Sequence, residues 1–70
     1  MLISARNQLR GNITNISRGA SIANVELDVG GQRVVASITV EAADELAIAE
    51  GDEVTAIIKA SDVMIATDPT

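Results

Sequence analysis

Two cationic side chains are the residues of this chain best suited to bind an anion. Ser4 and Arg6 lie two residues apart in the segment SARNQLRG, and the only lysine, Lys59, follows an apolar run near the other end of the chain. An arginine and a lysine brought together would balance a dianion, each charge pair contributing on the order of 4 kcal/mol before desolvation at an effective dielectric constant near 20. The simpler interpretations, a surface ion pair for Arg6 and a solvated strand end for Lys59, remain open.

A second group of hydrogen-bond donors is expected where the segment SITVEA begins a helix. If Thr39 caps this helix, the backbone N–H groups of Val40, Glu41 and Ala42 are among the unpaired donors of its first turn. The helix dipole adds partial positive charge at the same place, which suits a tetrahedral oxyanion. The alternative that Thr39 only caps the helix is also open.

The composition leaves little room for catalysis. The chain has no His, Cys or Tyr and one Lys, so carboxylates are the main candidates for acid–base chemistry. The acidic residues at positions 44–45 and 50–53 fit a solvated surface, and the second group lacks the spacing of a calcium loop. We therefore expect no enzymatic activity, no cofactor and no metal bound directly by side chains.

The charge of the chain argues against two classes of partner. The formal net charge is −5, whereas nucleic acids and anionic membranes attract clustered Lys and Arg. The chain also has no aromatic residue on which bases could stack, which disfavours an oligonucleotide-binding module. It contains no apolar run long enough to cross a membrane and no signal-peptide pattern, so a cytoplasmic location is expected.

Alternating polarity predicts the strands that must position these residues. A long first strand is expected from Leu2 to Ile16, with Ser4 and Arg6 on one face. Gly30-Gly31 predicts a tight hairpin, because a type I′ turn needs positive φ at both central positions. The other expected elements are a turn, two strands, a short helix and two more strands, over residues 17–20, 23–29, 32–39, 41–46, 54–60 and 63–66.

This order of elements is that of an OB-fold. We predict an all-β fold, a five-stranded OB-fold-like barrel with one short helix between strands 3 and 4, although half of a β-sandwich or an SH3-like barrel has a similar strand count. A single domain is expected over residues 1–67, with a frayed tail over residues 68–70. A domain of this size buries only about 60% of its unfolded surface. With no Cys or His for disulfides or zinc, association between copies is the expected support.

Two segments, ISARNQLRGNI and AIIKASDVMI, resemble the signature segments of the molbindins. These small Mop proteins are similar to the TOBE domains of molybdate transporters and molybdate-responsive regulators, and the resemblance extends over essentially the whole chain. It implies a homohexamer, a trimer of dimers, that binds molybdate or tungstate between subunits for intracellular storage and homeostasis. The alternative function is a structural or regulatory assembly domain without a ligand of its own.

The resemblance also implies which residues bind the oxyanion. From the two signature segments and from the neighbouring subunit these are Ser4, Ala5, Arg6, Lys59, Ala60 and Ser61, together with Thr39, Val40 and Ala42. Many relatives carry a serine at the position of Ala42, so this chain lacks one hydroxyl donor there. The family also has a second class of site near its three-fold axis, which we assign to the turn at Gly19-Ala20.

Overall fold

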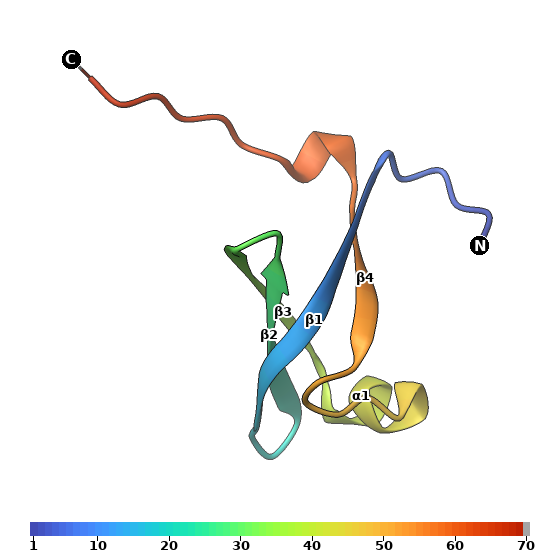
Figure 1. Ribbon diagram of the computed structural model, residues 1–70. Coiled ribbons are helices and arrows are strands. Elements are labelled where there is room, and N and C mark those ends of the chain that lie inside the picture. The colour runs from blue at the N-terminus through green and yellow to red at the C-terminus, as the bar shows by residue number, and fades with distance from the viewer. Residues whose placement is uncertain (70) are drawn as a thin grey trace.

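A twisted antiparallel sheet with one short helix at its lower end makes up the computed structural model, which describes residues 1–69 (Figure 1). The strands are β1 (Asn7–Arg18), β2 (Ile22–Val29), β3 (Gln32–Thr39) and β4 (Glu53–Ile58), arranged in the order β3-β2-β1-β4. Helix α1 (Val40–Leu46) connects β3 to β4, and a 3-10 turn, η1 (Ala60–Asp62), follows β4. The mostly β fold with one helix between the third and fourth strands is therefore confirmed.

Strand β1 organises the sheet because it pairs with both β2 and β4. Its inward positions include Gly11 and Ile13, and a bulge at Thr14 then shifts the register so that Ile16 faces the same side. A Cβ on Gly11 would lie 2.6 Å from the carbonyl oxygen of Asp28, so this position has no room for a side chain. The bulge explains how one strand keeps its apolar residues on one face over its whole length.

The core is a single aliphatic layer on one face of the sheet. Ile13, Val25 and Leu27 are at most 4% exposed. Partly buried side chains surround them: Ile16, Val29, Val34, Ala36, Ile38, Ile48, Val54 and Ala56. Since a fully buried aliphatic side chain contributes about 1.5–3 kcal/mol, three such residues make a thin core, as the chain length predicts.

Two local predictions are confirmed, the hairpin turn at Gly30-Gly31 and the helix cap at Thr39. Gly30 and Gly31 form the hairpin turn with φ of 56° and 88°, and the Gly31 N–H donates to the Asp28 carboxylate at 3.0 Å. Thr39 caps α1, its hydroxyl oxygen accepting from the Ala42 N–H at 3.0 Å. Both depend on neighbouring residues only, which is why the sequence predicts them well.

Three strand predictions are wrong. The first strand begins at Asn7, not at Leu2, and the fourth ends at Ile58, not at Ala60. The fifth strand, expected over residues 63–66, is not formed, and the sheet of four strands does not close into a barrel. The reason is common to all three: a strand needs a hydrogen-bonded neighbour, and β1 and β4 pair only from Asn7 and Ile58 inward.

After η1 the chain runs away from the sheet (Figure 1). We call residues 63–69 the C-terminal tail. Of the frayed tail predicted over residues 68–70, Thr70 lies outside the described residues. Within residues 1–69, no helix has the length and apolarity to span a membrane.

Candidate functional site

The pairing of β1 with β4 brings the two predicted signature segments to one end of the sheet. The last residue pair of this ladder is Asn7 opposite Ile58, and Arg6 and Lys59 are the next residues along their strands. Neighbouring strands lie about 4.8 Å apart, so the two backbones leave the sheet side by side. Three predicted site residues directly precede β1 and three directly follow β4: Ser4, Ala5 and Arg6, and Lys59, Ala60 and Ser61.

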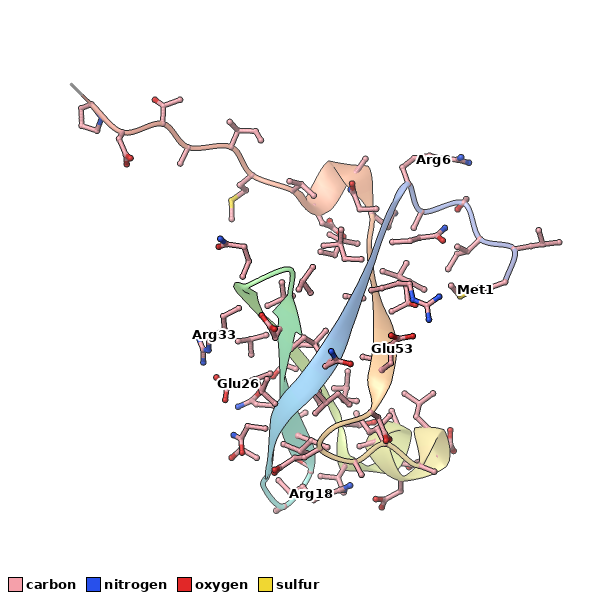
Figure 2. All side chains as sticks on the ribbon, viewed as in Figure 1. Met1, Arg6, Arg18, Glu26, Arg33 and Glu53 are labelled. Atoms are coloured by element: carbon pink, nitrogen blue, oxygen red, sulfur yellow. The ribbon has the colours of Figure 1, made fainter. Side chains whose placement is uncertain are left out.

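Arg6 and Lys59 differ from the other cationic residues because they form no ion pair within residues 1–69. The other three arginines all have a carboxylate partner: Arg10 with Glu53, Arg18 with Asp44 and Arg33 with Glu26. Arg6 and Lys59 have no carboxylate partner within 4.0 Å in the part of the chain that the structure describes. Figure 2 shows Arg6 at the start of β1 with its guanidinium directed away from the sheet. Among residues 1–69, one end of the molecule thus carries two positive charges that form no ion pair.

Ser4 and Arg6 are held together by a bend and not by a shared strand face, which corrects the sequence-based prediction. The Arg6 Nε–H donates to the Ser4 carbonyl oxygen at 3.1 Å, so the two terminal guanidinium nitrogens remain for a ligand. Ala5 is only 9% exposed, and its carbonyl oxygen accepts from the Gln8 amide at 3.3 Å. The buried Ala5 therefore anchors the segment while the polar side chains on both sides face solvent.

The segment after β4 offers backbone donors beside Lys59. In η1 the Asp62 N–H donates to the Lys59 carbonyl at 2.9 Å, and the Val63 N–H donates to the Ala60 carbonyl at 3.3 Å. The N–H groups of Ala60 and Ser61 come before these bonds and, over residues 1–69, have no backbone acceptor. All these residues are exposed, so an anion could reach the amides and the Lys59 ammonium together.

Thr39 lies at the opposite end of the sheet from Arg6 and Lys59. It pairs with Ile22 at the end of the sheet where α1 begins, whereas Arg6 and Lys59 lie beyond the other end (Figure 1). A strand of the length of β1 spans roughly 40 Å at about 3.3 Å per residue. One copy alone therefore cannot place Thr39 against an anion bound by Arg6, and a site with both residues needs two copies.

The predicted donors around Thr39 are already partly used. The Val40 N–H donates to the Ser21 carbonyl at 2.9 Å, and the Ala42 N–H donates to the Thr39 hydroxyl oxygen at 3.0 Å. Donation from Val40 or Ala42 to an anion would replace one of these bonds. The Thr39 oxygen acts as an acceptor in the cap, so its own O–H hydrogen is free to donate outward. Thr39 is the donor at this end that fits an anion best.

The turn that we assigned to a second site lies beside the same helix. The Gly19 N–H is used, because it donates to the Ile22 carbonyl at 2.8 Å. Ala20 lines a shallow hollow together with Thr39 and three acidic residues of α1, Glu41, Asp44 and Glu45. This acidic lining makes the hollow a poor anion site within one copy. In residues 1–69 no three acidic side chains are grouped closely enough to hold a metal ion.

One further ion pair lowers the pKa of a carboxylate, but it lies away from both ends of the sheet. Hydrogen bonds from the side chains of Arg33 and Asn15, with the charge of Arg33, hold the pKa of Glu26 below its usual range. Glu26 lies in the middle of β2 and pairs with Val35 of β3. The sequence analysis did not single out this pair, and its place on the sheet indicates a structural role.

Known proteins are similar to this chain in sequence and in fold. The family model described as TOBE domain matches residues 3–65. Molybdenum-pterin-binding protein 1 of Clostridium pasteurianum is 44% identical over 66 residues, which cover 93% of this chain and 97% of that protein. The structure of a molybdate binding protein from Sporomusa ovata superposes with a TM-score of 0.92 at 34% identity, covering 96% of this chain and 100% of that one.

A larger protein contains a similar unit. The structure of the cytoplasmic molybdate-binding protein ModG, in a form with molybdate bound, has a TM-score of 0.82 and 41% sequence identity. The match covers 86% of this chain and 43% of ModG. The fold described here therefore occurs both as a separate small protein and as part of a longer one.

Proposed function

Because this chain belongs to the TOBE domain family, we propose that it binds molybdate or tungstate and serves as a cytoplasmic, non-enzymatic store of the oxyanion. The observation that carries the proposal is the pair of cations, Arg6 and Lys59, that share one end of the sheet and form no ion pair within residues 1–69. The relatives named for molybdate or molybdenum-pterin binding support the choice of ligand.

In the proposed site, Arg6 and Lys59 neutralise the two negative charges of the anion. The Ser4 hydroxyl and the backbone N–H groups near Ala5, Ala60 and Ser61 donate hydrogen bonds to its oxygens. Such a lining contains donors but few acceptors, so protonated phosphate, whose hydroxyl needs an acceptor, is disfavoured. Sulfate has the same charge and shape as molybdate and is the strongest competitor.

A second copy completes the site by contributing Thr39. A second copy is required because, within its own subunit, Thr39 lies at the end of the sheet opposite to Arg6 and Lys59. We propose that the assembly is the homohexamer, a trimer of dimers, that the resemblance implies. Sites between subunits would also account for the lack of an ion pair at Arg6 and Lys59 within residues 1–69 of one copy.

Isothermal titration of the native protein with molybdate, tungstate and sulfate tests this function. We expect heat with the first two, and a dissociation constant roughly 10- to 100-fold weaker in Arg6→Ala and in Lys59→Ala, since a hydrogen bond to a charged group contributes about 1.5–3 kcal/mol. Arg33→Ala is the matched control, because it removes a cation that is already paired with Glu26. No heat with any of the three anions would leave an assembly domain without a ligand.

A further inference from the structure

The hollow beside α1 combines a donor that suits an anion with side chains that repel one. Thr39 lines this hollow, whose volume is ≈ 570 Å³. The same hollow is lined by three exposed acidic residues of α1, Glu41, Asp44 and Glu45. A second copy that presents Thr39 to an anion therefore presents these carboxylates as well, and their charges need an explanation.

Only one of the three carboxylates is neutralised within its own copy. The Arg18 guanidinium donates to the Asp44 carboxylate at 2.9 Å. Glu41 and Glu45 form no ion pair in the part of the chain that the structure describes. These two residues are four positions apart in a helix, so their side chains lie on one face. Counted over residues 1–69, the hollow thus has two carboxylates that are not in ion pairs.

The opposite end of the sheet carries the complementary charge. Over the same residues, Arg6 and Lys59 are the two cations that form no ion pair. When Thr39 of a second copy completes the anion site, the two cations of one copy meet the two carboxylates of the other. Two positive and two negative side-chain charges then balance before any ligand is present, which is the arrangement that favours pairing across an interface.

We propose that Glu41 of the second copy is a built-in competitor of the oxyanion and pairs with Arg6 and Lys59 when the site is empty. This inference rests on the proposed function, because it requires the site between copies that Thr39 completes. Glu41 has this role in preference to Glu45 because it lies two residues from Thr39, in the first turn of α1, whereas Glu45 lies one turn further along the helix.

The Glu41 carboxylate and the oxyanion exclude each other from the site. A bound dianion already balances both cations, so a carboxylate that stays beside it adds repulsion without a partner. The exposed Glu41 side chain must therefore turn away when the anion enters. Binding replaces one ion pair with another, and the affinity for every dianion is lower than the two cations alone would give. A store with this device releases its anion more readily.

Molybdate titration of Glu41→Gln measures the competition. The substitution keeps the size of the side chain and removes its charge, so we expect a dissociation constant about two- to five-fold lower than that of the native protein, the effect of one exposed ion pair. Glu50→Gln is the matched control and should bind as the native protein does. Glu50 is exposed, does not line the hollow and forms no ion pair within residues 1–69.

The titration separates this inference from the proposed function. Equal affinities for Glu41→Gln and Glu50→Gln, in a protein that binds molybdate, would overturn the role of Glu41 and leave the function intact. No heat from the native protein with molybdate or tungstate would overturn the proposed function itself.

Carbodiimide cross-linking of the native protein locates the ion pair, because the reagent joins a carboxylate to an amine that is in contact with it. Lys59 is the only lysine of the chain. Without molybdate, we expect an amide between Lys59 and Glu41 of a second copy, seen as a dimer on a denaturing gel and identified by peptide mass spectrometry. Saturating molybdate should reduce this product at least two-fold, and Lys59→Arg, which keeps the charge but not the reactive amine, should abolish it. Linkage of Lys59 to other carboxylates only would contradict the proposal, and so would an amount of product that molybdate leaves unchanged in a protein shown to bind it.

Discussion

Among the five glycines, Gly11 is the one at which an added Cβ would lie closest to other atoms. An added Cβ would lie 2.6 Å from the Asp28 carbonyl oxygen and 2.8 Å from a methyl carbon of Val29. We expect Gly11→Ala to lower the free energy of unfolding by about 1–3 kcal/mol, because backbone and side chains must move apart. Urea unfolding followed by circular dichroism measures this loss. Asn12→Ala, at the next and exposed position, is the control, and equal midpoints for both variants would contradict the expectation.

Thr39 has two roles that single substitutions can separate. Thr39→Asp keeps an oxygen that caps α1 but carries a negative charge and no donor, so we expect native stability with loss of molybdate binding. Thr39→Asn also caps the helix and keeps N–H donors, so it should retain measurable affinity. Parallel thermal melts and titrations of both variants check the separation. Tight binding by Thr39→Asp would show that Thr39 only caps the helix.

The pKa of Glu26 gives a pH dependence with a defined sign. Its folded pKa lies below the usual range of a glutamate, chiefly because the Arg33 side chain hydrogen-bonds to the charged form. The stabilisation is therefore present above the pKa of the unfolded state and is lost as the pH falls through the folded pKa. We expect Arg33→Ala to raise the pKa of Glu26, which an NMR titration of its side-chain carboxyl carbon measures. An unchanged pKa in that variant would exclude Arg33 as the cause.

The bulge in β1 decides which face each half of this strand presents. Ile13 pairs with Leu27 and Asn15 with Glu26, so Thr14 is the additional residue. Deleting Thr14 should leave Ile13 and Ile16 on the core face, whereas deleting Asn12 flips one half of the strand.

The two deletions of β1 therefore have different expected costs. We expect the Thr14 deletion to fold and the Asn12 deletion to unfold, because loss of each buried isoleucine costs about 1.5–3 kcal/mol. Circular dichroism and urea midpoints of both proteins measure the difference. Equal destabilisation by the two deletions would show that the bulge is needed for more than the register.

At the scale of the whole molecule, the two halves of the candidate anion site lie at opposite ends of one copy. Arg6→Ala keeps Thr39, and Thr39→Asp keeps both cations, so neither variant forms a complete site alone. If sites form between copies, unfolding and refolding the two variants together should restore molybdate binding in about a quarter of the sites, by random assembly. Titration of the mixture against each variant alone measures the restoration. No restoration in a mixture shown to co-assemble would place the whole site within one chain.

The identities of the functional segments and most of the local structure are determined by the sequence. Alternating polarity identified β2 and β3, Gly30-Gly31 identified their hairpin, and Thr39 identified the start of α1. Each of these depends on residues next to one another in the chain, whose conformational preferences are encoded locally. The two cationic segments were also evident, because Arg6 and Lys59 stand out by type.

Only the tertiary structure decided where strands begin, end and change face. Residues 2–6 and 63–66 have the pattern of strands, but no neighbouring strand in the chain pairs with them. The bulge at Thr14 and the distance between Arg6 and Thr39 likewise follow from the pairing of β1 with two partners. A strand is stabilised by hydrogen bonds to another segment, so its extent is a property of the pair and is absent from the sequence of either member alone.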